Sequence, residues 1–338
     1  HPIVTPFRVL RISGILFLIC LAVFVGSLFA GPGQVGVRTL LASLLSTGSG
    51  SFAGDADAGQ TILLSLRLPR LVFAGIVGAA LSVSGVVFQA LLRNPLADPY
   101  ILGISGGAAV AALGAITLGA ATFWVDASAF AGALTAMVVV FGLAHGDGSW
   151  TQTRLLLTGV IVAAGCGAAV SLMLALAPDT RVMSMLFWMM GDASAAARPW
   201  PALVVLALAL VAVMPFARDL NVLARGELSA RALGVRVGHL RIALYVLASL
   251  LTATSVTLVG SVGFVGLVVP HLVRLVLGND QRVLIPAAAL AGGTLLTLAD
   301  TAARTVIAPQ QLPVGVLTAL IGVPVFLFLL SRGSRISR

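Results

Sequence analysis

Long apolar stretches, separated by short polar or proline-containing segments, run through the whole chain. Two of them, Leu71 to Leu92 and Pro99 to Val125, contain no charged residue. A helix needs roughly 20 mostly apolar residues to cross a bilayer. The pattern predicts ten spanning helices, over residues 11–31, 68–92, 99–119, 124–144, 153–177, 199–217, 238–260, 263–277, 284–302 and 311–331.

These ranges predict an all-α integral membrane protein with about ten transmembrane helices in one domain, residues 1–338. Backbone groups in lipid must be hydrogen-bonded within the protein, so a spanning segment is either a helix or a strand of a closed barrel. The apolar stretches lack the alternation, over about ten residues, that barrel strands show. An even number of crossings places both ends of the chain on the same side.

The composition agrees with a membrane protein. Only 9% of the residues are charged and 59% are hydrophobic, with a mean hydropathy of +1.10, whereas a soluble domain carries about 25% charged residues. Both cysteines, Cys20 and Cys166, lie inside apolar stretches, which indicates packing residues and argues against a disulfide framework. The four histidines do not form a metal-binding motif, so we expect no metal site.

The charge distribution predicts the orientation. All twenty basic residues are arginine. With a cytoplasmic N-terminus, fourteen of them fall on the inner side and six on the outer side, in agreement with the positive-inside rule. Both termini are therefore expected in the cytoplasm. The net charge of +9 reflects this topology, and nucleic acid is not an expected partner because no soluble basic domain is present.

The segment RNPLADPYILGIS, residues 93–105, separates two apolar stretches. The Asn94–Pro95 step ends the preceding helix, since proline disfavours the helical conformation of the residue before it. Asp98 and Pro99 are typical of a helix start, with an N-cap followed by proline at the first position. A tight turn between two helices is predicted here.

The most charged segment is the loop at about 218–241, expected on the cytoplasmic side. Within it a short helix is predicted from Glu227 to Leu233, because Glu227 and Arg231 form an i,i+4 pair and Gly234 is a natural C-terminal stop. Such a helix is too short to be stable alone. It is either a solvated connector or a docking helix for a soluble partner.

Motifs for nucleotide chemistry are missing from the sequence. No GxxxxGK[ST] occurs, and a chain without lysine cannot form that loop. GPGQVG at 31–36 follows an apolar helix rather than a strand, so we interpret it as a chance match. If ATP drives this protein, another chain binds it. An ion-coupled secondary transporter, the alternative, needs ionisable residues deep in the membrane, and the acid Asp300 lies near the outer end of its stretch.

Seven blocks, in order along the chain, resemble one family of membrane proteins: RLPR (67–70), GAALSVSGVVFQALLRNPLADPYILGISGGA (78–108), RLLLTG (154–159), FWMMGD (187–192), GELSARALGV (226–235), VGFVGLVVPHLVRL (262–275) and LADTAARTVIAPQQLPVGVLTALIGVPVF (298–326). They are similar to the permease subunits of type II bacterial ABC importers, the FecCD-type family for haem, ferric siderophores and cobalamin. The resemblance implies a homodimer in the inner membrane, two cytoplasmic ATPase subunits and a periplasmic substrate-binding protein.

The same resemblance implies two gates and two docking sites. A cytoplasmic gate is expected at Asn94, Leu96, Gln152 and Thr153, and a periplasmic gate at Met183, Met185, Leu186 and Phe187. Coupling to the ATPase is expected at Arg225, Gly226, Glu227, Leu228, Arg231, Leu233 and Gly234. Docking of the binding protein is expected at Arg67, Arg70 and Arg304.

The substrate implied by the resemblance is a large metal chelate. Haem is favoured by the similarity of the last block to haem permeases, and cobalamin or a ferric siderophore is the alternative. The permease itself is expected to be no enzyme and to hold no cofactor, with ATP and Mg²⁺ bound by the partner ATPase. A membrane-embedded enzyme is disfavoured because no catalytic constellation is present.

Overall fold

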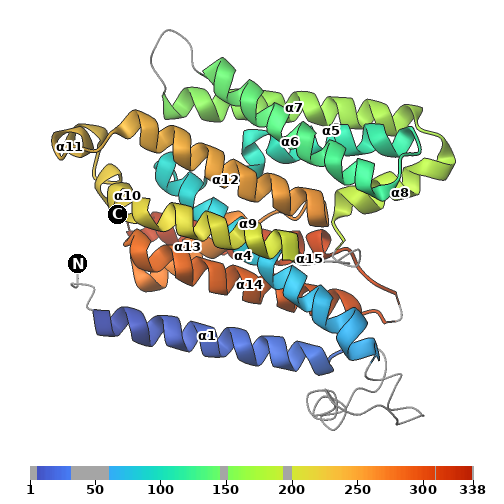
Figure 1. Cartoon of the computed structure of the whole chain (residues 1–338), viewed down its shortest axis with the longest axis horizontal. Helices are drawn as coiled ribbons and strands as arrows, with labels where there is room; N and C mark the ends of the chain where they lie inside the picture. The colour runs from blue at the N-terminus through green and yellow to red at the C-terminus, as the bar shows by residue number, and fades with distance from the viewer. Residues whose placement is uncertain (1–5, 32–60, 145–150, 193–199, 309, 337–338) are drawn as a thin grey trace.

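The computed structural model describes residues 6–31, 61–144, 151–192, 200–308 and 310–336. Every regular element in these ranges is helical (Figure 1). The elements are α1 (Pro6–Phe29), a π-helical segment η1 (Ile62–Arg67), α4 (Leu68–Leu91), η2 (Pro99–Leu102), α5 (Ile104–Thr117), α6 (Thr122–Ala144), α7 (Gln152–Leu176), α8 (Asp179–Met190), α9 (Trp200–Val213), η3 (Met214–Phe216), α10 (Ala217–Leu223), α11 (Glu227–Ala232), α12 (Val237–Val259), α13 (Val265–Leu277), α14 (Gln281–Thr305) and α15 (Val314–Ile336).

The all-α membrane fold is confirmed. Within the described ranges, seven helices are long and apolar enough to span a bilayer, and α5, α13 and most of α15 are shorter apolar helices. Together these described helices correspond to the ten predicted spans. The predicted boundaries agree with the observed ones to within a few residues, as for α12, which begins at Val237 and ends at Val259 where 238–260 was predicted.

Helix α4 forms the centre of the bundle and packs against α12, α13 and α14 (Figure 1). Nearly all of it is buried, which is why its sequence is apolar on every face. Its contact with α14 is close because Gly78 lies against the backbone of Gly292, where no larger side chain would fit. Small residues at such crossings allow the backbones to approach, and dispersion contacts then hold the helices together.

The predicted helix over 99–119 is divided in the structure. Asp98 caps its start as predicted, accepting a hydrogen bond from the amide of Tyr100 at 2.9 Å, but the helix that follows is the short 3-10 segment η2. Gly103 then adopts a left-handed conformation with φ of 78°, and α5 begins at Ile104. As a result α5 has only 14 residues, a length of about 21 Å, which is less than the hydrocarbon thickness.

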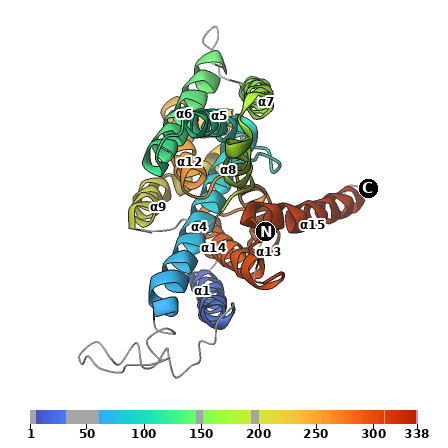
Figure 2. The ribbon, with the colours of Figure 1, turned by 90° about the vertical axis from the view of Figure 1, so that its right-hand side faces the viewer.

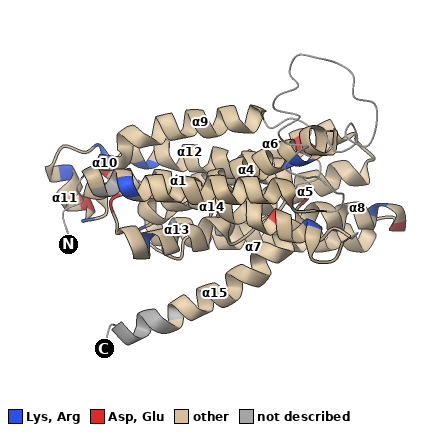
Figure 3. Ribbon diagram, turned by 90° about the horizontal axis from the view of Figure 1, so that it is seen from below, with Lys and Arg blue, Asp and Glu red and all other residues tan. Residues whose placement is uncertain are grey.

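The bundle has two distinct ends. One end carries α11, the start of α1 and the far end of α15, and we name it the α11 end (Figure 1). The opposite end carries α8 and the last turn of α1, and we name it the α8 end. Arginine and acidic residues gather towards these ends, while the middle is almost free of charge (Figure 3). Helix α15 projects from the rest of the bundle (Figure 2).

Candidate functional site

Helix α11 is formed as predicted and presents apolar side chains to solvent. It covers Glu227–Ala232, one residue less than the predicted range, and Gly234 follows with φ of 83°. Leu228 and Leu233 are 86% and 70% exposed. Leu228 in α11 and Leu233, which directly follows the helix, therefore place apolar surface in solvent, where it is available to another protein.

Glu227 anchors α11 to the body of the protein. Its carboxylate accepts hydrogen bonds from Arg231 at 2.7 Å, the predicted i,i+4 pair, and from Arg241 on α12 at 2.8 Å. Although partial burial acts to raise it, the two arginines bring the pKa of Glu227 below its ordinary value. The second partner was not predicted, because Arg241 lies 14 residues further along the chain. These pairs fix the orientation in which the leucines are presented.

The turn at 93–98 is held by its own side chains. Asn94 accepts a hydrogen bond from the amide of Leu96 through its side chain, at 2.9 Å, and one from the amide of Ala97 through its carbonyl, at 3.1 Å. Arg93 adopts φ of 47° at the start of the turn. Leu96 remains 40% exposed. The turn therefore has a fixed shape and directs a leucine out of the bundle.

The start of α7 meets this turn, as the predicted gate requires. The side-chain amide of Gln152 donates to the carbonyl of Leu91, the last residue of α4, at 3.3 Å. Thr153 is exposed beside it. Two segments about 60 residues apart in the sequence are thereby brought together. The structure supports their proximity, and their role as a gate stays a prediction.

Helix α8 exposes three of the four residues predicted for the periplasmic gate. Met183, Leu186 and Phe187 follow the i, i+3, i+4 spacing of one helix face, and all three are exposed. Met185 is different, because it is fully buried and packs with Leu113 of α5 and other core residues. Met185 is packed inside this subunit because two residues along a helix lead to the opposite face, and its role in a gate stays a prediction.

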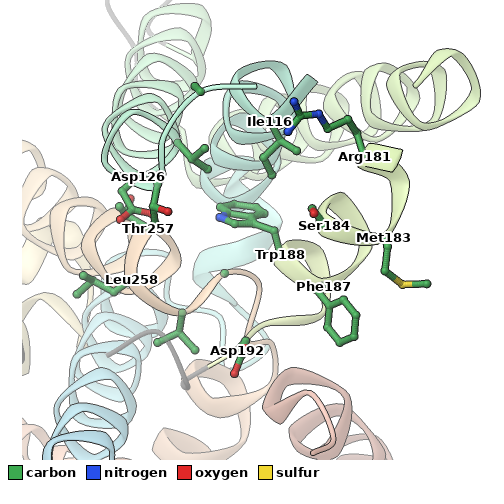
Figure 4. Close-up of a pocket in the computed structure, with 15 residues that line it drawn as sticks. Ile116, Asp126, Arg181, Met183, Ser184, Phe187, Trp188, Asp192, Thr257 and Leu258 are labelled. Carbon is green, nitrogen blue, oxygen red and sulfur yellow. The ribbon is translucent and has the colours of Figure 1, made fainter. Parts of the chain in front are cut away.

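A pocket of about 470 Å³ lies at the α8 end, between α8, the turn from α5 to α6, and the end of α12 (Figure 4). Trp188 lies between Asp126 and Thr257 on one side and Ser184 on the other. Met183, Phe187 and Arg181 also contribute to its wall. Sequence reasoning identified Met183 and Phe187 as gate residues but missed the pocket. Its two acids, Asp126 on α6 and Asp192 after α8, lie far apart in the sequence.

A second cavity, of about 610 Å³, lies between the end of α8, the segment that joins α12 to α13, and α15. Its lining is apolar, with Met189, Met190 and Phe264 facing the α15 side chains. Phe264 has φ of 69°, a strained conformation for a large residue. Irregular backbone at membrane depth is tolerated where it lines a cavity or is buried in protein. This cavity is therefore a candidate part of a path along α15.

The three outer arginines predicted for docking lie together at the α8 end, but they are not exposed. They surround Asp300, and we name Arg67, Arg70, Asp300 and Arg304 the outer arginine cluster. Asp300 is fully buried, and Arg67 and Arg304 are only 4% and 6% exposed. Arg67 and Arg304 are therefore buried within this subunit, and the role of the three arginines in docking stays a prediction.

Arg70 makes the strongest contacts in the outer arginine cluster. Its Nε and Nη2 both lie 2.9 Å from the Oδ1 of Asp300, and its Nη1 donates to Gln311 at 2.9 Å. Arg67 instead donates to the carbonyl of Leu28, at 2.8 Å, in the last turn of α1. Carbonyl groups at a helix C-terminus have no partner within the helix, and an arginine satisfies them well.

No group of three or more His, Cys, Asp or Glu side chains that could hold a metal occurs among the described residues. Cys20 and Cys166 are free thiols. The polar chemistry of the described ranges therefore consists mainly of ion pairs at the two ends and hydroxyl-to-carbonyl hydrogen bonds within the helices. Within the described ranges none of these groups forms a nucleophile-and-base arrangement.

Comparison with known proteins identifies the relatives of this chain. Over 82% of its length it is 43% identical to the cobalamin import system permease protein BtuC of Halobacterium salinarum, covering 75% of that protein. It is 39% identical to the hemin transport system permease protein HmuU of Yersinia pestis, over 94% of this chain and 95% of the relative. The vitamin B12 import system permease protein BtuC of Escherichia coli is 39% identical, over 88% of this chain and 94% of that protein.

The fold is also that of a solved transporter. A metal-chelate type ABC transporter in an inward-facing conformation matches with a TM-score of 0.82 and 30% identity, over 96% of this chain and 99% of that chain. The model of the FecCD transport family matches residues 17–332. The chain belongs to the FecCD transport family.

Proposed function

We propose that this chain is the permease subunit of an ATP-driven importer that moves a large metal chelate from the periplasm to the cytoplasm. In this proposal the α11 end faces the cytoplasm and the α8 end faces the periplasm, in a bacterial inner membrane. Both termini are then cytoplasmic, and most of the arginines lie on the inner side, as the positive-inside rule requires.

The observation that carries the proposal is the exposed apolar surface of α11. Leu228, in a helix of six residues, and Leu233, directly after that helix, extend into solvent. A helix of this length is too short to be stable without tertiary contacts. The Glu227 ion pairs hold it in place. Such a rigid apolar projection suits the groove of an ATPase subunit, which would bind ATP and Mg²⁺. The permease would transmit the motion without binding a cofactor.

A second copy of the chain would complete the path. Helix α15 projects from the bundle and exposes apolar residues along its length, and α7 is almost uncovered within one subunit (Figure 2). Two copies related by symmetry would place these helices and the cavity beside α15 around a common axis. The exposed face of α8 would then lie at the periplasmic mouth, and the 93–98 turn with Gln152 at the cytoplasmic mouth.

Haem is the substrate we favour, with cobalamin as the second candidate. The lining of the cavity beside α15 is apolar and includes two methionines and a phenylalanine, and soft side chains of this kind adapt to a large planar ligand. The similarity to a hemin permease over almost the whole chain supports haem. The similarity to a cobalamin permease supports the alternative.

The test is uptake by the reconstituted complex. The permease is co-expressed with its ATPase and placed in proteoliposomes with the binding protein outside, and uptake of haem, cobalamin and a ferric siderophore is measured with and without ATP. We expect ATP-dependent uptake of haem, and none with an ATPase variant that binds but does not hydrolyse ATP. Uptake driven by an ion gradient without ATP would identify a secondary transporter and contradict the proposal.

A further inference from the structure

The pocket of about 470 Å³ at the α8 end, which we name the outer pocket, carries opposite charges on two of its walls. Asp126 enters it from near the start of α6, and Arg181 enters it from the first turn of α8 (Figure 4). Within the described ranges neither side chain takes part in an ion pair. Charges inside proteins are normally paired, so each of these two is available to a ligand group of the opposite charge.

Thr257 adds an unused hydrogen-bonding group to the acidic wall of the outer pocket. It lies near the end of α12, and its Oγ1 atom is buried without a hydrogen-bond partner among the described residues. Thr257 and Asp126 face the pocket from the same wall (Figure 4). Buried polar atoms are nearly always hydrogen-bonded. The carboxylate and the hydroxyl oxygen together suit a group with several N–H donors, such as a primary ammonium.

The rest of the outer pocket is largely apolar. Ile116 of α5, Phe187 of α8 and Leu258 of α12 belong to its lining. The indole of Trp188 projects among these side chains (Figure 4), and an aromatic face attracts a cation as well as an apolar group. The outer pocket therefore combines an acidic wall, a basic wall and an apolar surface, which together fit a zwitterion that also has an apolar part.

The start of α6 places the outer pocket at the level of lipid headgroups. Phe123 and Trp124 are both exposed there, with their ring centroids 5.4 Å apart. Exposed aromatic rings near the end of a spanning helix are typical of the membrane–water interface. Asp126 follows Trp124 by two residues and is therefore at nearly the same depth. A zwitterion with an apolar part is, at this depth, the headgroup of a phospholipid.

We propose that the outer pocket binds an ethanolamine phosphate group, supplied by the headgroup of phosphatidylethanolamine. The ammonium group donates to Asp126 and to Oγ1 of Thr257. The phosphate accepts from Arg181, because a guanidinium fork matches phosphate oxygens. Phosphatidylcholine carries the same charges, but its quaternary ammonium has no N–H group to donate. Asp126 therefore sets the choice of headgroup, and Arg181 sets the affinity for the phosphate.

A lipid bound in this way would join three helices of one subunit. Asp126 belongs to α6, Thr257 to α12 and Arg181 to α8. The headgroup would hold α8, the helix predicted for the periplasmic gate, against the other two helices. Binding of the headgroup is nevertheless separate from transport, and it needs neither an ATPase nor a metal chelate.

The experiment measures the affinity of single lipid molecules for the purified, delipidated permease by native mass spectrometry. The protein in detergent is titrated with phosphatidylethanolamine, phosphatidylcholine or phosphatidylglycerol, all with the same acyl chains, and the dissociation constant of the first bound lipid is determined. Four proteins are compared: wild type, Asp126→Asn, Arg181→Gln and the matched control Asp179→Asn. Asp179 is an exposed acid at the same end that does not line the outer pocket.

We expect the wild-type protein to bind phosphatidylethanolamine about tenfold more tightly than phosphatidylcholine, because only the former gives Asp126 charge-assisted hydrogen bonds. In Asp126→Asn this preference should disappear. Arg181→Gln should weaken the binding of both lipids by a similar factor and keep the preference, since both carry the phosphate. Phosphatidylglycerol, which has no ammonium group, should bind no more tightly than phosphatidylcholine. Asp179→Asn should behave as the wild type.

Two results would overturn the proposal: equal wild-type affinity for the three lipids, or a preference for phosphatidylethanolamine that persists in Asp126→Asn. The thermal midpoint of each lipid-free variant shows whether it is folded, and Arg181→Gln provides a second variant if Asp126→Asn is not. Unchanged lipid affinity in Arg181→Gln would also contradict the proposal. Free ethanolamine phosphate tests the source of the headgroup, and competition at the same concentration as the lipid would overturn the lipid as its source. The uptake assay can succeed while these binding tests fail, so the two proposals fail separately.

Discussion

The two ends of the bundle use arginine in opposite ways. At the α11 end Arg231 is 67% exposed and pairs with a carboxylate one helical turn away. At the α8 end Arg70 and Arg304 are nearly buried and share Asp300, which is fully buried. Exposed pairs are screened by water and salt, whereas buried pairs are strong only while both partners remain. The α11 end is therefore suited to reversible contact, and the α8 end to holding three helices in register.

Removal of Asp300 should have the largest effect. Asp300→Ala leaves Arg70 and Arg304 without their buried counter-charge, and we expect the free energy of unfolding to fall by about 3–5 kcal/mol. The measurement is thermal or denaturant unfolding of the purified permease in detergent. Asp179→Ala, which removes an exposed acid at the same end, is the control. It should change the free energy of unfolding by about 0.5 kcal/mol or less. Equal effects of the two variants would show that burial does not strengthen the Asp300 ion pairs.

The second prediction concerns the α11 surface. Leu228→Asp with Leu233→Asp should weaken ATPase binding by about 2–4 kcal/mol, a loss of roughly thirty- to a thousand-fold in affinity, because exposed apolar anchors are exchanged for charges. The fold should be unaffected, since neither side chain is packed. Co-purification of the ATPase and the thermal midpoint of the permease are the two readouts.

Leu118→Asp is the matched control for that experiment, because Leu118 is 87% exposed but lies at the α8 end of α5. It should leave ATPase co-purification unchanged. If both sets of variants retain the ATPase, α11 is a solvated connector and the proposed function loses its main support.

Much of the α11 end could be predicted from the sequence because its interactions are local. The Glu227–Arg231 pair, the stop at Gly234 and the cap formed by Asp98 all involve residues within four positions of one another. Helical propensity, capping and i,i+4 pairing act at that range. The existence of about ten apolar helices was predictable for the same reason, since each is defined by its own composition.

The α8 end was less predictable because its interactions join distant segments. Arg70 and Asp300 are 230 residues apart, so nothing local indicates that the arginines are occupied within the subunit. The burial of Met185 was missed for a different reason. Its spacing from Met183 already places it on the other helix face, but the run of methionines and aromatic residues was treated as one surface. The break at Gly103 depends on a positive φ that composition alone does not reveal.

The third prediction is a pH dependence at the 93–98 turn. Burial raises the pKa of Asp98 from 3.8 to about 6, against the effect of the Tyr100 amide, which lowers it. The folded state therefore binds more protons than the unfolded state between these values, and stability should rise as the pH falls from about 6 to about 4, by about 1–3 kcal/mol. Asp98→Asn keeps the acceptor for Tyr100 and should abolish this dependence.

Thermal unfolding at pH 7, 6, 5 and 4 measures the effect. Asp280, at the start of α14, serves as the internal contrast, because Arg282 and Asn221 lower its pKa to about 2. The contribution of Asp280 to stability is present above its unfolded-state pKa and is lost only below about pH 4. It therefore does not affect the range from about pH 6 to about pH 4 in which Asp98 is tested. An Asp98→Asn variant with the same pH profile as the wild type would show that Asp98 is not protonated in this range.

The smallest effect is expected at the ion pairs of α11. Glu227→Gln removes the charge that pairs with Arg231 and Arg241. Because Glu227 and Arg231 are partly exposed, the loss should be about 0.2–1 kcal/mol and confined to α11 and its contact with α12. Hydrogen exchange of the α11 amides measures this local opening, and the midpoint for global unfolding should not change.

Changes in salt concentration and pH then distinguish the Glu227 ion pairs from the buried Asp300 ion pairs at the α8 end. Raising the salt concentration should bring wild-type exchange of α11 towards that of Glu227→Gln, because the exposed charges are screened. Acid should do the same: the pKa of Glu227 lies below its ordinary value of 4.5, so its contribution is present above pH 4.5 and is lost as the pH falls through the folded-state value. The amides around Asp300 should respond to neither salt nor Glu227→Gln. If salt opened both ends equally, burial would not be what distinguishes the two sets of arginines.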